Sequence, residues 1–228
     1  MTSISLIIPV LNEASTLEKT VLRLLDDTEI EIIVVDGGSQ DETVKISQAL
    51  GVKVFCCNQT GRAHQMNIGA STATGEILIF LHADTILPQD YKHWVKTTLS
   101  NPKIIAGAFE LKIDSEKLSL RLVEAMVNLR SRFLSLPYGD QAFFLYASVF
   151  RDMGGFANMP IMEDYEFIQR LRRKGKISIA PVSVITSDRR WRKLGVIKTT
   201  LINQLIIIGY YLGISPDRLA AFYRRQPK

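Results

Sequence analysis

The chain has 228 residues, of which 46% are hydrophobic and 22% are charged, proportions typical of a globular protein with a substantial core. Its two cysteines, Cys56 and Cys57, exclude a disulfide framework and a cysteine-rich zinc site, and we expect both thiols to be buried in a reducing compartment. The net charge is +5, but residues 187–228 carry nine Lys or Arg against two Asp (+7), so residues 1–186 carry −2.

The basic tail indicates an anionic partner such as a nucleotide phosphate, an anionic lipid head group or a nucleic acid. Nucleic acid is the weakest of the three, because the basic residues are not interleaved with base-stacking side chains, and we expect no such partner. No signal peptide is visible, and the apolar run 205–214 is shorter than the ~20 residues a membrane span needs. We therefore expect a cytoplasmic protein, either free or held peripherally at the inner face of the membrane.

Apolar strands alternate with helices along the chain, which predicts an α/β fold with a mostly parallel central sheet. The first two strands each end at an acidic loop, and such loops meet at the carboxyl edge of a parallel sheet, where ligands bind. In chain order we predict strands at 4–10, 30–35, 52–57, 76–81, 104–111, 142–147 and 177–185, and helices at 16–26, up to about 50, 61–70, 94–99, 118–134, 162–174, 194–212 and after Ser215.

The loop after the first strand excludes two common nucleotide sites. Residues 9–13 contain no glycine, so the Gly-x-Gly-x-x-Gly fingerprint of NAD and FAD sites is absent. The phosphate-binding pattern Gly-x-x-x-x-Gly-Lys-Ser/Thr is also absent from the chain. Asp36 lies at the end of the second strand. Its own segment does not decide whether it caps a turn or contacts a ligand.

Several motifs in a fixed order are more specific than any one of them. They are Pro9-Val10-Leu11-Asn12-Glu13, Asp36-Gly37-Gly38-Ser39-Gln40-Asp41, His82-Ala83-Asp84, Glu163-Asp164-Tyr165-Glu166 and Arg189-Arg190-Trp191. Together the motifs resemble family 2 glycosyltransferases of the GT-A fold, over most of the chain. The sequence looks most similar to small soluble members with Gly-Arg-Ala, His-Ala-Asp and Gly-Asp-Gln motifs. It departs from the family at His82, where the first Asp of an Asp-x-Asp metal motif is usual.

The resemblance implies one GT-A domain over residues 1–228. Residues 1–111 would bind the nucleotide-sugar, 112–193 would form the acceptor and catalytic half, and 194–228 a helical tail. The expected reaction is an inverting transfer of a sugar, hexosyltransferase-like, from a nucleotide diphosphate-sugar to an acceptor hydroxyl or phosphate, with a lipid among the candidate acceptors. The motifs leave open the sugar, the nucleotide, the acceptor and the oligomeric state.

The resemblance also assigns roles to residues. Asp84 would bind the divalent metal, Mn²⁺ or Mg²⁺, and Asp164, with Glu163 beside it, would be the catalytic base. The nucleotide and donor set is Pro9, Asn12, Glu13, Asp36, Arg62, Gln65, Asn67, His82 and Ala83. The acceptor and diphosphate set is Asp140, Gln141, Arg190 and Trp191.

Structural alternatives exist for the same side chains. His82 either contacts the donor or the metal, or it packs at a strand end. Arg62 either meets phosphate or is a solvated surface residue, and Glu163-Asp164 either performs catalysis or begins a helix, where acids are favoured by the macrodipole. Asp140 either orients the acceptor or forms a tight turn. Arg190 and Trp191 either meet the diphosphate and sugar or form a basic cluster before an apolar helix.

Two other functions are compatible with parts of the pattern. The departure at His82 is compatible with a catalytically degenerate protein that only binds nucleotide-sugars. A sugar nucleotidyltransferase is disfavoured, because that class opens with a glycine-rich basic loop that residues 11–16 lack.

The helix at 194–212 carries an apolar stripe formed by Ile197, Leu201, Leu205, Ile208 and Leu212. This stripe either packs on the catalytic body or lies in a membrane interface with the basic residues toward anionic lipid. We favour packing for the stripe, together with weak peripheral association of the whole protein.

Overall fold

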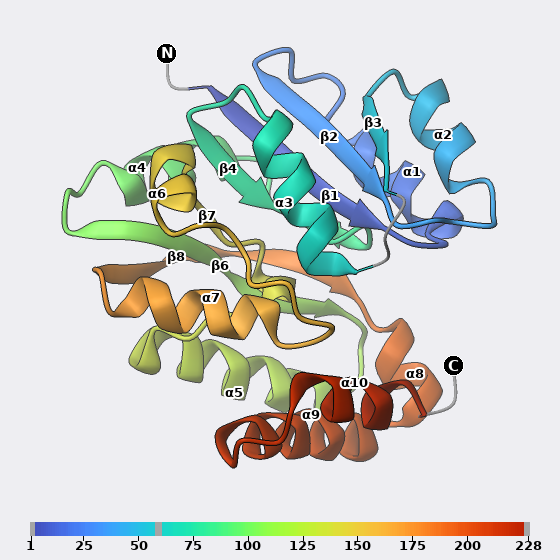
Figure 1. Ribbon diagram of the computed structural model, residues 1–228, viewed down its shortest axis with the longest axis vertical. Coiled ribbons are helices and arrows are strands. Elements are labelled where there is room, and N and C mark those ends of the chain that lie inside the picture. The colour runs from blue at the N-terminus through green and yellow to red at the C-terminus, as the bar shows by residue number, and fades with distance from the viewer. Residues whose placement is uncertain (1–2, 58–60, 226–228) are drawn as a thin grey trace.

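The computed structural model describes residues 3–57 and 61–225, and the described residues form an eight-stranded sheet in the order β3-β2-β1-β4-β7-β6-β8-β5 (Figure 1). The strands are β1 Ile4–Val10, β2 Ile30–Asp36, β3 Lys53–Cys56, β4 Ile77–Phe80, β5 Thr85–Ile86, β6 Ile104–Asp114, β7 Phe144–Tyr146 and β8 Lys176–Ser187. The helices are α1 Ala14–Leu22, α2 Thr43–Ala49, α3 Arg62–Thr72, α4 Tyr91–Leu99, α5 Leu118–Leu134, α6 Ala147–Asp152, α7 Glu163–Arg172, α8 Arg189–Leu194, α9 Val196–Tyr211 and α10 Pro216–Arg224, with one 3-10 turn, Gly139–Gln141.

The sheet is mostly parallel, as predicted. Strands β3, β2, β1 and β4 run parallel, and so do β6 and β8, whereas β7 and β5 are antiparallel to their neighbours. The carboxyl ends of β1, β2 and β4 therefore lie at one edge and bring the first three motifs together. The predicted α/β architecture is confirmed.

Helices cover both faces of the sheet because its central strands are apolar on both sides. Alternate residues of β1 point to opposite faces, so Leu6 and Ile8 pack in one core with α1 and α4. Ile7 packs in the other core with α3, α6 and α7. Helix α3 lies close to β1 at Gly69, where an added Cβ would come within 2.4 Å of Ile7 Cγ2.

Some short elements differ from the sequence prediction. The two-residue strand β5 and the six-residue helices α6 and α8 were not predicted, because segments this short hold too few residues for a period to be recognised. The two thiols were predicted to be buried. This is wrong, since β3 lies at the sheet edge, where Cys56 is exposed and Cys57 is partly exposed.

The apolar stripe of α9 was expected to pack on the body, and this is also wrong. Its five members are 52 to 77% exposed (Ile197, Leu201, Leu205, Ile208, Leu212). The face that packs inward consists instead of Thr199, Ile202, Ile206 and Gly209. Helix α9 is apolar nearly all round, so its sequence period could not reveal which side faces the protein.

No helix within residues 3–57 and 61–225 combines the length and the apolar character needed to cross a bilayer. The end of the basic tail, residues 226–228, lies outside the described residues, and so do residues 1 and 2 at the start of the predicted domain.

The close packing of α3 on β1 gives a test of the fold. We expect Gly69→Ala to lower the free energy of unfolding by about 1–3 kcal/mol, because the new methyl group must displace Ile7 or the helix. Urea unfolding followed by circular dichroism measures this change. Ser71→Ala, on the exposed face of the same helix, is the matched control and should be near neutral. Equal stabilities of the two variants would contradict the packing.

Candidate active site

The loops after β1 and β2 are connected by side-chain hydrogen bonds. Asn12 has a left-handed backbone (φ 57°), which Asn tolerates better than most residues, and its Oδ1 accepts from the Gln40 backbone N–H at 2.8 Å. The Asn12 N–H donates in return to Ser39 Oγ at 2.8 Å, and the Glu13 N–H donates to Thr43 Oγ1 at 2.8 Å. These bonds fix the carboxyl edge of the sheet as one rigid surface.

Asp36 closes β2 and is 3% exposed. Its Oδ2 accepts from the backbone N–H groups of Gly38 and Ser39 at 2.8 and 2.9 Å. The other carboxylate oxygen, Oδ1, is buried and has no partner among the described residues. An acceptor left unpaired in this way is costly unless a ligand donates to it.

Arg62, the first residue of α3, lies at the centre of a charged cluster. Its Nε pairs with the carboxylate of Glu163, its Nη2 lies 3.5 Å from Asp164 Oδ2, and its Nη1 lies 3.1 Å from His82 Nε2. A guanidinium can only donate, so His82 Nε2 must accept and is unprotonated. Burial, with the charge of Arg62 adding to it, lowers the pKa of His82 to about 3, and the imidazole is therefore neutral.

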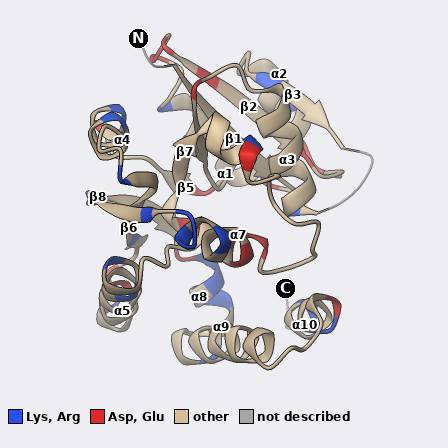
Figure 2. Ribbon diagram, turned by 60° about the vertical axis from the view of Figure 1, so that its left-hand side comes forward, with Lys and Arg blue, Asp and Glu red and all other residues tan. Residues whose placement is uncertain are grey.

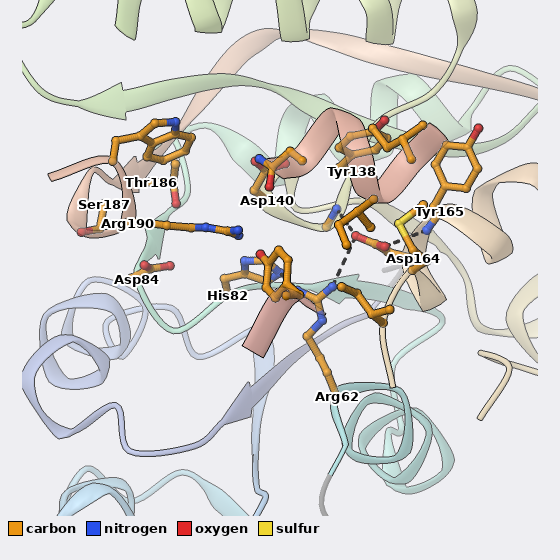
Figure 3. Close-up of a pocket in the computed structure, with 18 of the residues that line it drawn as sticks. Arg62, His82, Asp84, Tyr138, Asp140, Asp164, Tyr165, Thr186, Ser187 and Arg190 are labelled. Atoms are coloured by element: carbon orange, nitrogen blue, oxygen red, sulfur yellow. Dashed lines mark hydrogen bonds and ion pairs between the residues drawn. The ribbon is translucent and has the colours of Figure 1, made fainter. Parts of the chain in front are cut away.

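Asp164 lies in the first turn of α7 and is held by three donors. Its Oδ2 accepts from the Gly139 backbone N–H at 2.8 Å and faces Arg62, and its Oδ1 accepts from the Tyr165 N–H at 2.7 Å. A Cβ at position 139 would lie 2.9 Å from Asp164 Oδ2 and 3.0 Å from His82 Nε2, so only glycine permits this approach. Figure 3 shows Arg62 reaching from α3 toward Asp164.

A second cluster involves Asp84, Glu13 and Arg189. Arg189 Nη2 lies 2.8 Å from Glu13 Oε2 and 3.1 Å from Asp84 Oδ2, so one cation bridges two carboxylates. Burial raises the pKa of Asp84, and Arg189 opposes this rise. No group of three or more His, Cys, Asp or Glu within residues 3–57 and 61–225 could hold a metal alone. The donor set does fit a divalent ion that shares its coordination with substrate phosphate.

Asp140, in the 3-10 turn, carries a buried Oδ1 with no partner among the described residues. Burial raises the pKa of Asp140 to about 6, with Arg130 opposing the rise and Asp164 adding to it. Asp140 is therefore a carboxyl group whose charge changes within the mildly acidic range, next to the better-paired Asp164.

Some of these groups line a cavity of about 390 Å³, whereas Asn12, Glu13 and Asp36 lie outside its lining. Its lining includes the polar and charged side chains of Arg62, His82, Asp84, Asp140 and Asp164. It also includes apolar and aromatic side chains in or near α7, α9 and α10: Ile161, Met162, Ile206, Ile207 and Tyr223. The cavity therefore suits a ligand with a polar reacting end and an apolar remainder.

Arg190 and Trp191 also line the cavity, carried there by α8. The Arg190 guanidinium stacks 4.2 Å from the centre of the Tyr223 ring and forms no ion pair with any residue of the described ranges. Burial lowers the pKa of Arg190. Figure 3 shows its side chain pointing toward His82 and Asp140. Trp191 Nε1 is buried with no partner in the described part of the chain.

The structure places other predicted residues outside the cavity, where their polar groups bind the protein itself. Gln65 Nε2 donates to the carbonyls of Val10 and Val35 at 2.8 and 2.7 Å. Asn67 exchanges two hydrogen bonds of 2.9 Å with the Phe156 backbone. Three further predicted residues also bind the protein itself. Gln141 bonds Phe109 and Ser131, the Ala83 carbonyl accepts from Thr20, and Glu163 pairs with Arg62. Pro9 lines a small void together with His82.

Several cavity residues were not predicted from the sequence, among them Tyr138, Tyr165, Asn203 and Tyr223. Tyr138 and Tyr165 adjoin the Gly-Asp-Gln and Glu-Asp motifs, and this adjacency was the only sequence signal for them. Asn203 is a polar residue within an apolar helix, which is a recognisable but weak signal.

Comparison with known proteins agrees with this geometry. The family model "Glycosyl transferase family 2" matches residues 5–159. The chain belongs to this family, and the predicted membership of the family 2 glycosyltransferases is confirmed. A 4,4'-diaponeurosporenoate glycosyltransferase of Staphylococcus haemolyticus is 34% identical over 97 residues, 39% of this chain and 26% of that protein. An uncharacterized glycosyltransferase of Haemophilus influenzae is 27% identical over 190 residues, 78% of this chain and 75% of that protein.

A solved structure extends the likeness to the fold. The mannosyltransferase PcManGT from Pyrobaculum calidifontis, in complex with GDP-Man and Mn²⁺, has a TM-score of 0.65 and 19% sequence identity. The match covers 80% of this chain and 56% of that chain. The fold is therefore that of the GT-A glycosyltransferases, with a central, mostly parallel sheet and flanking helices.

The raised pKa of Asp140 predicts a pH-dependent stability. The folded protein binds this proton more tightly than an unfolded chain, in which the pKa is near 3.8, so Asp140 lowers stability as the pH rises through about 6. We expect Asp140→Asn to raise the free energy of unfolding by roughly 1–2 kcal/mol at about pH 7.5 and to leave it unchanged at about pH 4. Chemical unfolding at both pH values tests this. A gain of equal size at both would contradict it.

Proposed function

We propose that this protein is a metal-dependent, inverting glycosyltransferase that moves a sugar, hexosyltransferase-like, from a nucleotide diphosphate-sugar to an acceptor hydroxyl. The observation that carries the proposal is the position of Asp164, a carboxylate fixed by two backbone N–H groups and Arg62 at the wall of a cavity that also contains Asp84. Residues 1–111 would bind the donor, 112–193 would hold the acceptor and the base, and 194–228 would complete the acceptor side.

The donor would bind along the edge formed by β1, β2 and β4. The unpaired Oδ1 of Asp36 is suited to accept from an imide or amide N–H of the base. Glu13 follows the neighbouring strand β1 and is suited to the ribose. Asn12 and Gln65 would act as positioning residues, because their polar contacts in this structure hold the loops together, and Pro9 would shape the end of β1.

The donor diphosphate would lie between Asp84 and the arginines of α8. Asp84 would hold the divalent ion together with phosphate oxygens, and that ion would supply neutralisation of the charge that develops on the departing diphosphate. Arg189 already bridges the carboxylates of Asp84 and Glu13, which supports the view that these two carboxylates favour a bound cation. Arg190 forms no ion pair within the described residues, so its guanidinium is available for a phosphate.

Asp164 would act as the general base. The acceptor oxygen forms a bond to the anomeric carbon while its proton moves to Asp164, and the bond from the anomeric carbon to the diphosphate oxygen breaks. The electron pair of the broken bond leaves with the nucleoside diphosphate, so a single displacement inverts the anomeric centre. Neutral His82 would donate to the sugar through Nδ1, because its Nε2 accepts from Arg62, and Glu163 would position Arg62 and through it the base.

Replacing the base tests this assignment. Asp164→Asn keeps the shape and removes the basicity, so we expect kcat to fall roughly 10²–10⁴-fold while donor affinity is retained. Donor binding is measured by titration calorimetry and turnover by release of nucleoside diphosphate. Asp152→Asn, an exposed carboxylate on α6, is the control. Loss of affinity with kcat unchanged would make Asp164 a donor ligand instead.

The metal assignment is tested at Asp84. We expect Asp84→Asn to reduce turnover at least ~10²-fold and to abolish the stabilisation of bound nucleotide by Mn²⁺, because a carboxylate ligand is lost. Thermal shift with nucleoside diphosphate, with and without Mn²⁺, reads out binding without turnover. Asp114→Asn, exposed at the end of β6, is the control. Full activity of the wild-type protein in excess chelator would contradict metal dependence. Nucleotide binding with no sugar release in Mn²⁺ would favour a binding protein over an enzyme.

A further inference from the structure

Two neighbouring helices expose apolar stripes to solvent. On α5, five side chains one turn apart along one face are 56 to 85% exposed: Leu118, Leu122, Met126, Leu129 and Phe133. On α9, the exposed face carries Ile197, Leu201, Leu205, Ile208, Tyr211 and Leu212. Exposed apolar side chains are common singly, but two continuous stripes of this size mark an interaction surface. We call this set of side chains the α5–α9 surface.

The two stripes belong to one side of the molecule. Helices α5 and α9 contact each other, and Figure 1 shows both below the sheet, on the side away from β1–β4. On α5 the opposite face, with Leu120 and Ser131, is buried against the protein, and Glu124 there accepts from the Ile113 backbone. Each helix thus has a packed inner face, and the stripe lies on the opposite face.

The α5–α9 surface adjoins the active-site cavity. Helix α9 contributes Asn203, Ile206 and Ile207 to the cavity wall, while Leu205 and Ile208 of the same helix point outward. One helix thus separates the catalytic cavity from the exposed apolar surface. An acceptor with a hydroxyl or phosphate head and an apolar tail could place its head near Asp164 while its tail follows the apolar wall outward.

Basic side chains border the α5–α9 surface. Within residues 189–225 there are eight Lys or Arg and one acid, Asp217. Six exposed cations near the two helices have no ion-pair partner among residues 3–57 and 61–225: Lys117, Lys193, Lys198, Arg218, Arg224 and Arg225. Figure 2 shows α9 almost entirely tan, with blue on the adjoining α8.

We propose that the α5–α9 surface lies in the interface of an anionic lipid bilayer, with its apolar side chains at the acyl boundary and the bordering cations among the head groups. Amphipathic helices bind membranes in this way without spanning them, and each basic residue near the surface adds about 1 kcal/mol. The cavity then lies behind α9, one helix away from the membrane, and its acceptor is a membrane lipid. This last part rests on the proposed glycosyl transfer; the docking itself does not.

A second copy of the chain is a poorer partner for this surface. A two-fold contact would pair the α5–α9 surface with itself, and the bordering cations of both copies would face one another. An anionic bilayer neutralises these cations instead. It also accommodates two helices in one plane without requiring a complementary shape.

Vesicle flotation tests the docking. We expect the wild-type protein to float with vesicles of phosphatidylcholine containing about one third phosphatidylglycerol at low salt, and to be released at about 0.5 M salt. Leu205→Gln with Ile208→Gln on α9, and Leu122→Gln with Leu129→Gln on α5, should each lower the partition coefficient roughly 10- to 100-fold. Leu22→Gln with Leu25→Gln, exposed leucines at the end of α1 and in the turn after it, should leave it unchanged.

Circular dichroism and nucleotide binding, measured on every variant, show whether the variants fold. Wild-type protein that stays in the soluble fraction at low salt overturns the proposal, and so does equal binding by all variants. A dimer in light scattering that the α9 pair dissociates also overturns it, in favour of contact between copies. Flotation without nucleotide binding would refute the proposed function alone, whereas nucleotide binding without flotation would refute only the docking.

Discussion

The Arg62 guanidinium joins three groups from distant parts of the chain. It binds Glu163 and Asp164 at the start of α7, and His82 at the end of β4. Glu163 is 2% exposed, so its charge would be strongly destabilising without this partner. Burial, with the charge of the same guanidinium adding to it, keeps His82 neutral. The chemistry of the cavity depends on this one cation.

Helix α3 explains how Arg62 reaches that position. Two polar residues of the same helix, Gln65 and Asn67, tie it to the ends of β1 and β2 and to the loop before α7. The helix therefore connects the carboxyl edge of the sheet to the segment that leads into α7. Because Gly69 allows α3 to lie directly on Ile7 of β1, the arrangement is anchored in the core and not on a mobile loop.

Much of the first half could be predicted from the sequence. Apolar strands of β-branched residues, each followed by an acidic or amide residue, have only one common arrangement, a parallel sheet with those residues at its carboxyl edge. The neighbourhood of Asp36 and Asp84 follows from that rule. The family motifs then brought Asp164 into the same site.

Long-range pairing could not be predicted. Glu163 lies 101 residues beyond Arg62, and no local pattern indicates that one binds the other. Gln65, Asn67 and Gln141 have amide side chains of the kind that often bind ligands. In this structure each of these amides instead donates a hydrogen bond to a backbone carbonyl of the protein. Helix α9 is apolar on most sides, so the sequence identified a stripe without revealing that the stripe faces outward.

A double-mutant cycle between Arg62 and Asp164, read out as kcat, tests the central role of this cation most directly. Arg62→Lys keeps a charge for Glu163 but loses the fork that reaches His82 and Asp164. We predict that Arg62→Lys lowers kcat at least ~10-fold in the wild-type protein and has little further effect in Asp164→Asn, because both changes disable the same base. Additive losses from the two substitutions would contradict the account, since Arg62 would then act independently of Asp164.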